Sequence, residues 1–275
     1  MKCSWKDLMA VLPLRLRHLA EQAGGDGLWE IRMRLGMPTE LVSSRGSIWL
    51  NDRTTAEEIR FCINTASRYS PWTAQTLARG YVTAPGGHRI GIGGEMTVDQ
   101  GRVTGVREVE SLCIRVARDV TGIGKPFRML PGSILIIGPP GSGKTTLLRD
   151  LTREISHQQA VTVVDERGEL FPTGMVRGRG MDVLRLCPKP EGIEMALRTM
   201  GPATIAVDEI TGEEDARALL KAGWCGVRLI ATAHAASAAD LRSRPVYRPL
   251  WEMKLFEHLL TCHRDKSRTV ERMDL

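Results

Sequence analysis

The hydrophobic and polar positions of the chain follow two patterns, which change near residue 120. Residues 29–50 alternate apolar and polar side chains between glycine and proline breaks, a pattern typical of two or three half-buried strands. A threonine cap, early glutamates and helical spacing predict a helix over 54–70. Residues 80–118 are glycine-rich with alternating valine and isoleucine, which predicts β-hairpins.

The amino-terminal segment places Leu8, Leu12, Leu16 and Leu19 on one side of a predicted helix, with Pro13 as a kink. An amphipathic membrane anchor is conceivable because basic residues flank this stripe. Packing against the rest of the protein is the commoner use of such a stripe, and we favour it.

From Pro131 onward, apolar strands alternate with helices, which is typical of a mainly parallel sheet buried on both faces. The predicted strands are 133–138, 161–166, 204–209 and 227–234, and the predicted helices start at Lys144 or cover 191–200 and 213–222. Glycine and proline interrupt the pattern over 119–127. We therefore predict a smaller α+β domain over 1–125, followed by an α/β domain over 126–275.

Composition agrees with a globular protein, because 42% of the 275 residues are hydrophobic and 25% are charged. The net charge of +6 comes without a long basic block, so nucleic-acid binding is not indicated. Six cysteines are scattered without a Cys-x-x-Cys pair, which disfavours zinc. We expect reduced thiols in a cytoplasmic protein, without a signal peptide or transmembrane segment.

Residues 138–146 match the phosphate-loop motif between a predicted strand and a helix, the context that supports binding of ATP or GTP. Backbone N–H groups would surround the β-phosphate, and Lys144 would reach the β- and γ-phosphates. Thr145 would offer its hydroxyl to Mg²⁺, and Thr146 would contact the α-phosphate. The predicted binding residues are Gly138, Pro139, Pro140, Gly141, Ser142, Gly143, Lys144, Thr145 and Thr146.

Two Asp-Glu pairs, Asp165-Glu166 and Asp208-Glu209, end predicted strands, at the edge where such sheets bind ligands. A phosphate-loop hydrolase needs one carboxylate for the Mg²⁺ shell and a group that activates water. Spacing favours the later strand, as a crossover neighbour of the loop strand. His234 ends the last predicted strand and could contact the γ-phosphate, although a purely structural histidine is equally compatible.

These segments resemble the stage III sporulation protein AA family, related to the secretion-type, AAA-like ATPases of type II and type IV secretion and pilus retraction. The resemblance spans about residues 29–240. It rests on GPPGSGKTTLLRD, VDERGEL and the stretch from LRTMGPATIAVDE to IATAHA, together with EIRMRLGMP, APGGHRIGIGGE and LCIRVAR in the first half. It implies a RecA-like, secretion-ATPase-like P-loop domain.

The resemblance also implies roles for site residues. Asp208 would lie on the Mg²⁺ shell with Glu209 beside it, and Glu166, in the acidic box, would face the nucleotide. We take Glu209 as the first candidate for activating water because it adjoins the metal. Glu166 is its competitor, since the related ATPases place a catalytic carboxylate on that earlier strand. His234 would sense the γ-phosphate.

The segment GGHRIGIGG resembles the arginine-bearing strand of secretion ATPase amino-terminal domains. Arg89 is then a candidate finger that would reach a phosphate within its own subunit or across a subunit boundary, and Arg115 is a weaker candidate. A surface or interdomain ion pair is an equally good interpretation of either arginine. The tail beyond about residue 240 has room for a helix near 249–262 and one final strand.

By resemblance, the protein is an ATP- and Mg²⁺-dependent motor, a homo-hexamer by analogy. It would be a cytoplasmic protein on the mother-cell side of the forespore membrane, held there by membrane proteins of the same sporulation operon. Two alternatives stay open. One is a nucleic-acid-dependent ATPase, although aromatic residues are only 5%. The other is a nucleotide-dependent scaffold, which two intact Asp-Glu pairs disfavour.

Overall fold

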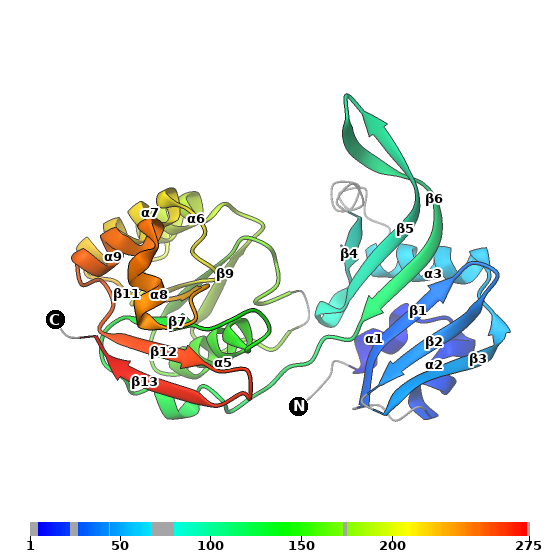
Figure 1. The fold of residues 1–275 in the computed structure, drawn as a ribbon, viewed down its shortest axis with the longest axis horizontal. Coiled ribbons are helices and arrows are strands. Elements are labelled where there is room, and N and C mark those ends of the chain that lie inside the picture. Colours follow the sequence, from blue (N-terminus) through cyan, green and yellow to red (C-terminus); the bar gives the residue numbers. More distant parts are fainter. Residues whose placement is uncertain (1–4, 23–26, 44, 68–79, 173–174, 274–275) are drawn as a thin grey trace. The chain divides into compact units, whose positions relative to one another are not determined.

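The computed structural model describes residues 5–22, 27–43, 45–67, 80–172 and 175–273. They form two compact units, Met1–Asp119 with Pro172–Met175, and Val120–Phe171 with Val176–Leu275 (Figure 1). The domain boundary that we predicted from the sequence, between residues 125 and 126, falls inside the second unit. Among the described helices, none is both long and apolar enough to cross a bilayer.

In the part of the first unit that the structure describes, an antiparallel six-stranded sheet packs against three α-helices. The strand order is β3-β2-β1-β6-β5-β4. The elements are α1 (Trp5–Val11), α2 (Leu14–Gln22), β1 (Leu28–Arg34), β2 (Pro38–Ser43), β3 (Gly46–Arg53), α3 (Ala56–Ser67), β4 (Tyr81–Thr83), β5 (Arg89–Asp99) and β6 (Arg102–Arg115). The predicted first helix is thus two helices, because Pro13 ends the first and begins the second.

Local sequence explains how α3 starts. The Glu58 backbone N–H donates to Thr55 Oγ1 at 3.2 Å, and the Thr55 N–H donates to Glu58 Oε2 at 3.0 Å. This reciprocal pair is a capping box, which satisfies two backbone donors that a helix start leaves open. The apolar stripe of the first two helices packs into this unit's core, with Leu8, Leu12 and Leu16 fully buried.

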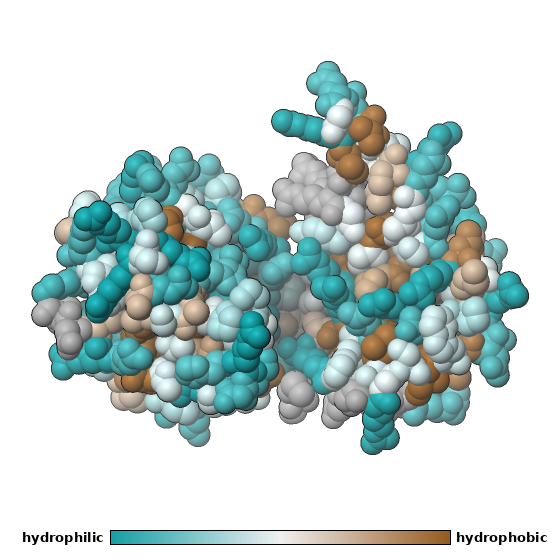
Figure 2. Space-filling view, viewed as in Figure 1, coloured by the Kyte–Doolittle hydropathy of each residue, from teal (hydrophilic) through white to brown (hydrophobic). Residues whose placement is uncertain are grey.

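Strands β5 and β6 continue as a two-stranded ribbon beyond the other strands of their sheet (Figure 1). Val98 and Val103 pair across this ribbon. Both are exposed, at 61% and 46%, and Figure 2 shows apolar surface on the ribbon.

The second unit is a seven-stranded sheet of order β13-β12-β7-β11-β10-β8-β9, parallel except for β13. This is the predicted α/β class with a mainly parallel sheet. The strands are β7 (Ile134–Ile137), β8 (Val161–Asp165), β9 (Met181–Arg185), β10 (Thr204–Val207), β11 (Arg228–Ala233), β12 (His258–Cys262) and β13 (Arg268–Arg272), and the helices are α5 (Lys144–Ile155), α6 (Lys189–Thr199), α7 (Glu213–Trp224), α8 (Ala238–Ser243) and α9 (Arg248–Glu252).

Alternation along the buried strands divides the core of this unit into two layers. Leu135 and Ile137 of β7 join the cluster formed with α6, α7 and α9. Ile134 and Ile136 join the cluster formed with α5. Successive side chains of a strand point to opposite faces, so an all-apolar strand is what a sheet with helices on both faces requires.

The tail beyond residue 240 differs from the predicted helix over 249–262 and single strand. Helix α9 stops at Glu252, and Lys254 has a left-handed backbone with φ 50°. The chain then forms β12, which is fully buried and pairs with β7 in parallel, and returns as β13. Residues 258–262 form a strand because they are buried in pairing with β7. The local sequence pattern does not show this long-range pairing.

Candidate functional site

Three glycines shape the loop between β7 and α5. Gly138, Gly141 and Gly143 have φ of 148°, 73° and 103°, values that favour glycine. A Cβ at Gly138 would also lie 2.3 Å from the carbonyl oxygen of Cys262. The loop opens directly into the N-terminus of α5, where backbone N–H groups and the helix dipole favour an anion.

The other loop residues surround this turn. Pro140 and Gly141 are exposed, whereas Pro139, Thr145 and Thr146 are partly buried. The structure therefore brings all nine predicted binding residues together at the start of α5.

The side chain of Lys144 reaches back to the first residues of the loop. Its Nζ donates to the carbonyl oxygens of Gly138 at 2.8 Å and Pro139 at 3.2 Å, and it lies 3.2 Å from His234 Nδ1. Burial lowers the pKa of Lys144, while nearby carboxylates and the Cys262 thiol oppose that shift. These contacts hold the ammonium at the centre of the loop.

The surroundings of Ser142 indicate whether the loop fits a phosphate. Its Oγ is buried and has no hydrogen-bond partner among the described residues. A buried hydroxyl without a partner costs about 1–3 kcal/mol. A phosphate oxygen at the loop could accept from this hydroxyl, so the residues present fit the group that the motif predicts.

Asp208 follows β10 and faces the start of α5. Its Oδ2 lies 3.4 Å from Thr145 Oγ1. Its Oδ1 accepts a hydrogen bond from Thr232 Oγ1 at 2.8 Å. Thr232 Oγ1 in turn accepts from the Glu209 N–H at 2.8 Å. The Thr232 hydroxyl thus fixes the Asp208 carboxylate, which together with the Thr145 hydroxyl forms the kind of oxygen donor set that suits Mg²⁺.

The predicted placement of the 204–209 strand beside the loop strand is wrong. Strand β11 lies between β7 and β10, and β8 lies beyond β10. Asp208 still reaches Thr145, because parallel strands end at the same edge of the sheet.

Glu209 has a strained backbone at this edge, with φ 26°, a region that non-glycine residues rarely adopt. Its Oε1 lies 3.1 Å from His234 Nε2, and its Oε2 lies 3.5 Å from Arg167 Nη1. Such strain concentrates at functional sites, where the surrounding contacts hold it in place.

His234 links Glu209 to Lys144. A lysine ammonium can only donate, so Nδ1 of His234 is the acceptor at 3.2 Å. Nε2 then carries the proton and donates to the Glu209 carboxylate. Both ring nitrogens are used by the neutral imidazole, and the side chains of the loop and of the acidic strand become one connected network.

Asp165, in contrast, organises the backbone. It is 1% exposed and accepts the N–H groups of Glu169 and Phe171, each at 2.9 Å. Burial raises the pKa of Asp165, and these backbone donors oppose the shift. From α5, Arg149 donates to the carbonyl oxygens of Glu169 and Leu170 at 2.8 and 2.5 Å. Asp165 therefore holds the turn that follows β8 and contacts nothing in the phosphate loop.

Glu166 is held by a buried lysine. Lys189 Nζ lies 2.5 Å from Glu166 Oε2 and 3.4 Å from Asp215 Oδ2, and Lys189 is 4% exposed. Asp215 also accepts the Thr211 N–H at 2.9 Å. The first turns of α6 and α7 are thereby joined to the end of β8.

Arg89 and Arg115 lie in the first unit, on paired positions of β5 and β6. The guanidinium of Arg89 lies 4.1 Å from the ring centroid of Tyr81, a cation–π distance. Arg115 Nε lies 3.6 Å from Glu30 Oε1.

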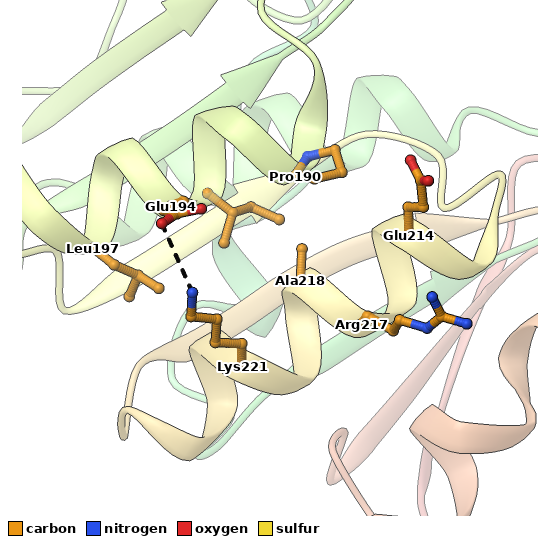
Figure 3. A pocket seen from close by; sticks show the side chains of 8 residues that line it. Pro190, Glu194, Leu197, Glu214, Arg217, Ala218 and Lys221 are labelled. Atoms are coloured by element: carbon orange, nitrogen blue, oxygen red, sulfur yellow. Dashed lines mark ion pairs between the residues drawn. The ribbon is translucent and has the colours of Figure 1, made fainter.

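A surface groove of about 310 Å³ runs between α6 and α7. Figure 3 shows its lining, with the Lys221–Glu194 ion pair at one end. None of its lining residues belongs to the phosphate loop or to the strand ends. This groove is therefore separate from the residues gathered at the sheet edge.

Sequence reasoning missed Thr232, Lys189 and Asp215. Thr232 could have been found, because it lies two residues before His234 within the predicted strand 227–234, and alternate residues of a strand share a face. Lys189 and Asp215 give no local signal. Lys189 begins α6 and Asp215 lies in the first turn of α7, where charged residues are common and do not by themselves indicate a buried ion pair.

Comparisons with known proteins agree with this fold. The family model for sporulation stage III, protein AA, matches residues 4–271. The stage III sporulation protein AA of Bacillus subtilis (strain 168) is 40% identical over 259 residues, which cover 86% of this chain and 83% of that protein.

Two solved structures share the fold at low sequence identity. The pilus retraction motor PilT with bound ADP matches with a TM-score of 0.66 and 17% identity, over 90% of this chain and 77% of that one. The Legionella pneumophila ATPase DotB matches with a TM-score of 0.61 and 19% identity, over 95% of this chain and 80% of that one. The second unit therefore has the P-loop fold of secretion ATPases.

The contacts of Asp165 predict a structural role. Asp165→Asn replaces one acceptor oxygen by an amide that faces a backbone N–H, so we expect the free energy of unfolding to fall by about 2 kcal/mol. Urea denaturation measures this change. Asp182→Asn, on the exposed part of neighbouring β9, should change it by less than about 0.5 kcal/mol. Equal effects of the two variants would contradict the role.

Proposed function

Because the chain belongs to the sporulation stage III protein AA family, we propose that it is an ATP-hydrolysing motor that energises a channel between mother cell and forespore. The observation that carries the proposal is the connected network at the sheet edge. It joins the loop lysine Lys144, through His234, to Glu209 beside Asp208.

Phosphate binding rests on the loop. Its N–H groups and Lys144 would hold the β- and γ-phosphates, and the Ser142 hydroxyl would gain a partner. Thr145 and Asp208 would hold Mg²⁺, which when bound neutralises charge on the phosphate oxygens. Thr232 keeps the Asp208 carboxylate oriented toward Thr145.

Glu209 is the proposed base. A water that attacks the γ-phosphorus would pass its proton to the Glu209 carboxylate, while the bond to the β-phosphate oxygen breaks and ADP leaves. His234 donates to this carboxylate and so fixes its orientation. The contact of His234 with Lys144 would make that orientation sensitive to the γ-phosphate.

Glu166 is the weaker candidate for the base. Its carboxylate is paired with the ammonium of Lys189, and accepting a proton would break that pair. The pair is also well placed to hold α6 and α7 against the end of β8, which is a supporting role.

The remaining parts of the proposal concern assembly. We propose a homo-hexamer in which ATP lies between domains or subunits, Arg89 approaches a phosphate, and hydrolysis shifts the amino-terminal unit, over about 1–125, against the ATPase unit. Membrane proteins of the same sporulation operon would hold the ring at the channel. The match to a pilus retraction motor with bound ADP supports a motor of this kind.

Lys144→Ala should lower the steady-state rate of ATP hydrolysis by about 100-fold or more, because the γ-phosphate loses its main cationic donor. A phosphate-release assay on the purified protein measures the rate. Lys221→Ala, an exposed lysine of α7, should leave it unchanged. Equal turnover by the parent and Lys144→Ala proteins would leave only a nucleotide-dependent scaffold.

We expect different effects from substitutions of Glu209 and Glu166. Glu209→Gln should keep ATP binding and lose turnover by about 10²–10⁴-fold, the range expected for a general base. Glu166→Gln should lose much less, because it alters a supporting ion pair. Binding and single-turnover measurements on both variants, with exposed Glu213→Gln as control, compare them. A larger loss in Glu166→Gln would transfer the role of base to Glu166.

Assembly has its own test. We expect light scattering to find a hexamer when ATP and Mg²⁺ are added to Glu209→Gln, which would bind but not hydrolyse the nucleotide. A monomer under every nucleotide condition would contradict the motor.

A further inference from the structure

The turn between β12 and β13 lies against the phosphate loop. Lys266 Nζ donates to the carbonyl oxygen of Gly141 at 2.5 Å, across 125 positions of sequence. Strand β12 pairs with β7 as far as Thr261 and Ile137, so its end runs beside the start of the loop. The Cys262 carbonyl oxygen occupies the space next to Gly138. The tail of the chain therefore forms one side of the loop.

This turn is internally fixed. The His263 N–H donates to Ser267 O at 3.0 Å, and the Lys266 N–H donates to His263 O at 3.1 Å. Asp265 Oδ1 accepts from both the N–H and the hydroxyl of Ser267, at 2.9 and 2.6 Å. Lys266 has a left-handed backbone with φ 70°. Lys266 thus extends from a defined turn and not from a loose end.

The turn carries more basic than acidic residues. Arg264, Lys266 and Arg268 surround a single acidic residue, Asp265. The buried Cys262 thiol interacts electrostatically with Lys144, Lys266 and Arg268. Lys144 and Lys266 come from distant parts of the chain, and both donate to carbonyl oxygens of the same loop.

We propose that Lys266 is a positioning residue of the nucleotide site, which anchors the apex of the phosphate loop and adds positive charge for a nucleoside triphosphate. This inference rests on the proposed binding of ATP at the loop. Among the described residues, Gly141 is the only hydrogen-bond partner of the Lys266 ammonium, which has three donors. The others can face the phosphate chain. Because Gly141 belongs to the turn around the phosphates, Lys266 acts on the phosphate end of the nucleotide and not on its base.

The test replaces Lys266 without disturbing its turn. Asn and Gly both tolerate a left-handed backbone, so Lys266→Asn and Lys266→Gly keep the turn and remove the charge. We expect each to weaken ATP binding about fivefold to tenfold at low salt, by the same factor for GTP. KM for ATP should rise equally, with kcat retained within about twofold. Lys266→Arg should restore most of the affinity.

Calorimetric titration with ATP and with GTP, without Mg²⁺, measures binding, and thermal unfolding checks that each variant is folded. Lys254→Asn is the matched control, an exposed lysine with φ 50° that lies before β12, at the other end of the strand. It should bind ATP like the parent.

The outcomes separate the two proposals. Unchanged ATP affinity in both Lys266 variants, with loss in Lys144→Ala, overturns only the role of Lys266. An equal loss of ATP affinity in Lys266→Arg would also overturn the role of Lys266, because the charge would then not matter. Different losses of affinity for ATP and for GTP would overturn it too, because the charge would then not act on the phosphates. Unchanged affinity in Lys144→Ala overturns the proposed nucleotide site itself.

Discussion

Parallel pairing of β11 with both β7 and β10 is the constraint on which the site depends. In this register Val207 pairs with Ala231 and Ile137 pairs with Ala233, so the phosphate loop, Asp208 and His234 follow their strands at one edge of the sheet. The Thr232 hydroxyl then joins β11 to the acidic end of β10. A shift of one residue in either pairing would turn Thr232 and His234 to the opposite face. The chemistry of the site is therefore built on the backbone pairing of three buried strands.

The two Asp-Glu pairs look alike in sequence and differ in surroundings. Asp165 is covered by the turn that follows it, and both of its carboxylate oxygens accept hydrogen bonds from backbone N–H groups of that turn. Asp208 keeps one oxygen toward Thr145. Glu166 is paired with a buried ammonium, whereas Glu209 faces a histidine that also contacts the loop lysine. The contrast supports Glu209 as the catalytic carboxylate, and it arises from the chain segments that follow each pair.

Much of the second unit could be predicted from sequence because its signals are local. The glycines and lysine of the loop, and the all-apolar strands beside it, carry their own pattern. The strand order could not be predicted, because nothing in the 227–234 segment shows that it inserts between β7 and β10. The partly buried, half-polar strand β9 and the tail strand β12 were not predicted, for the same reason. Lys189 was missed because its partners are distant in sequence. The roles of Arg89 and Arg115 rest on resemblance and stay predictions.

The position of Cys262 has a consequence for local unfolding of the protein. Its carbonyl oxygen forms the wall against which Gly138 is packed, and β12 covers the edge of β7. Local unfolding that released the last two strands would leave β7 with an unpaired edge and the loop without one side. Such opening of the tail would also expose the backbone amides of the loop to exchange. The segment near the carboxyl end is an integral part of the loop's scaffold, and shortening the chain before β12 would remove it.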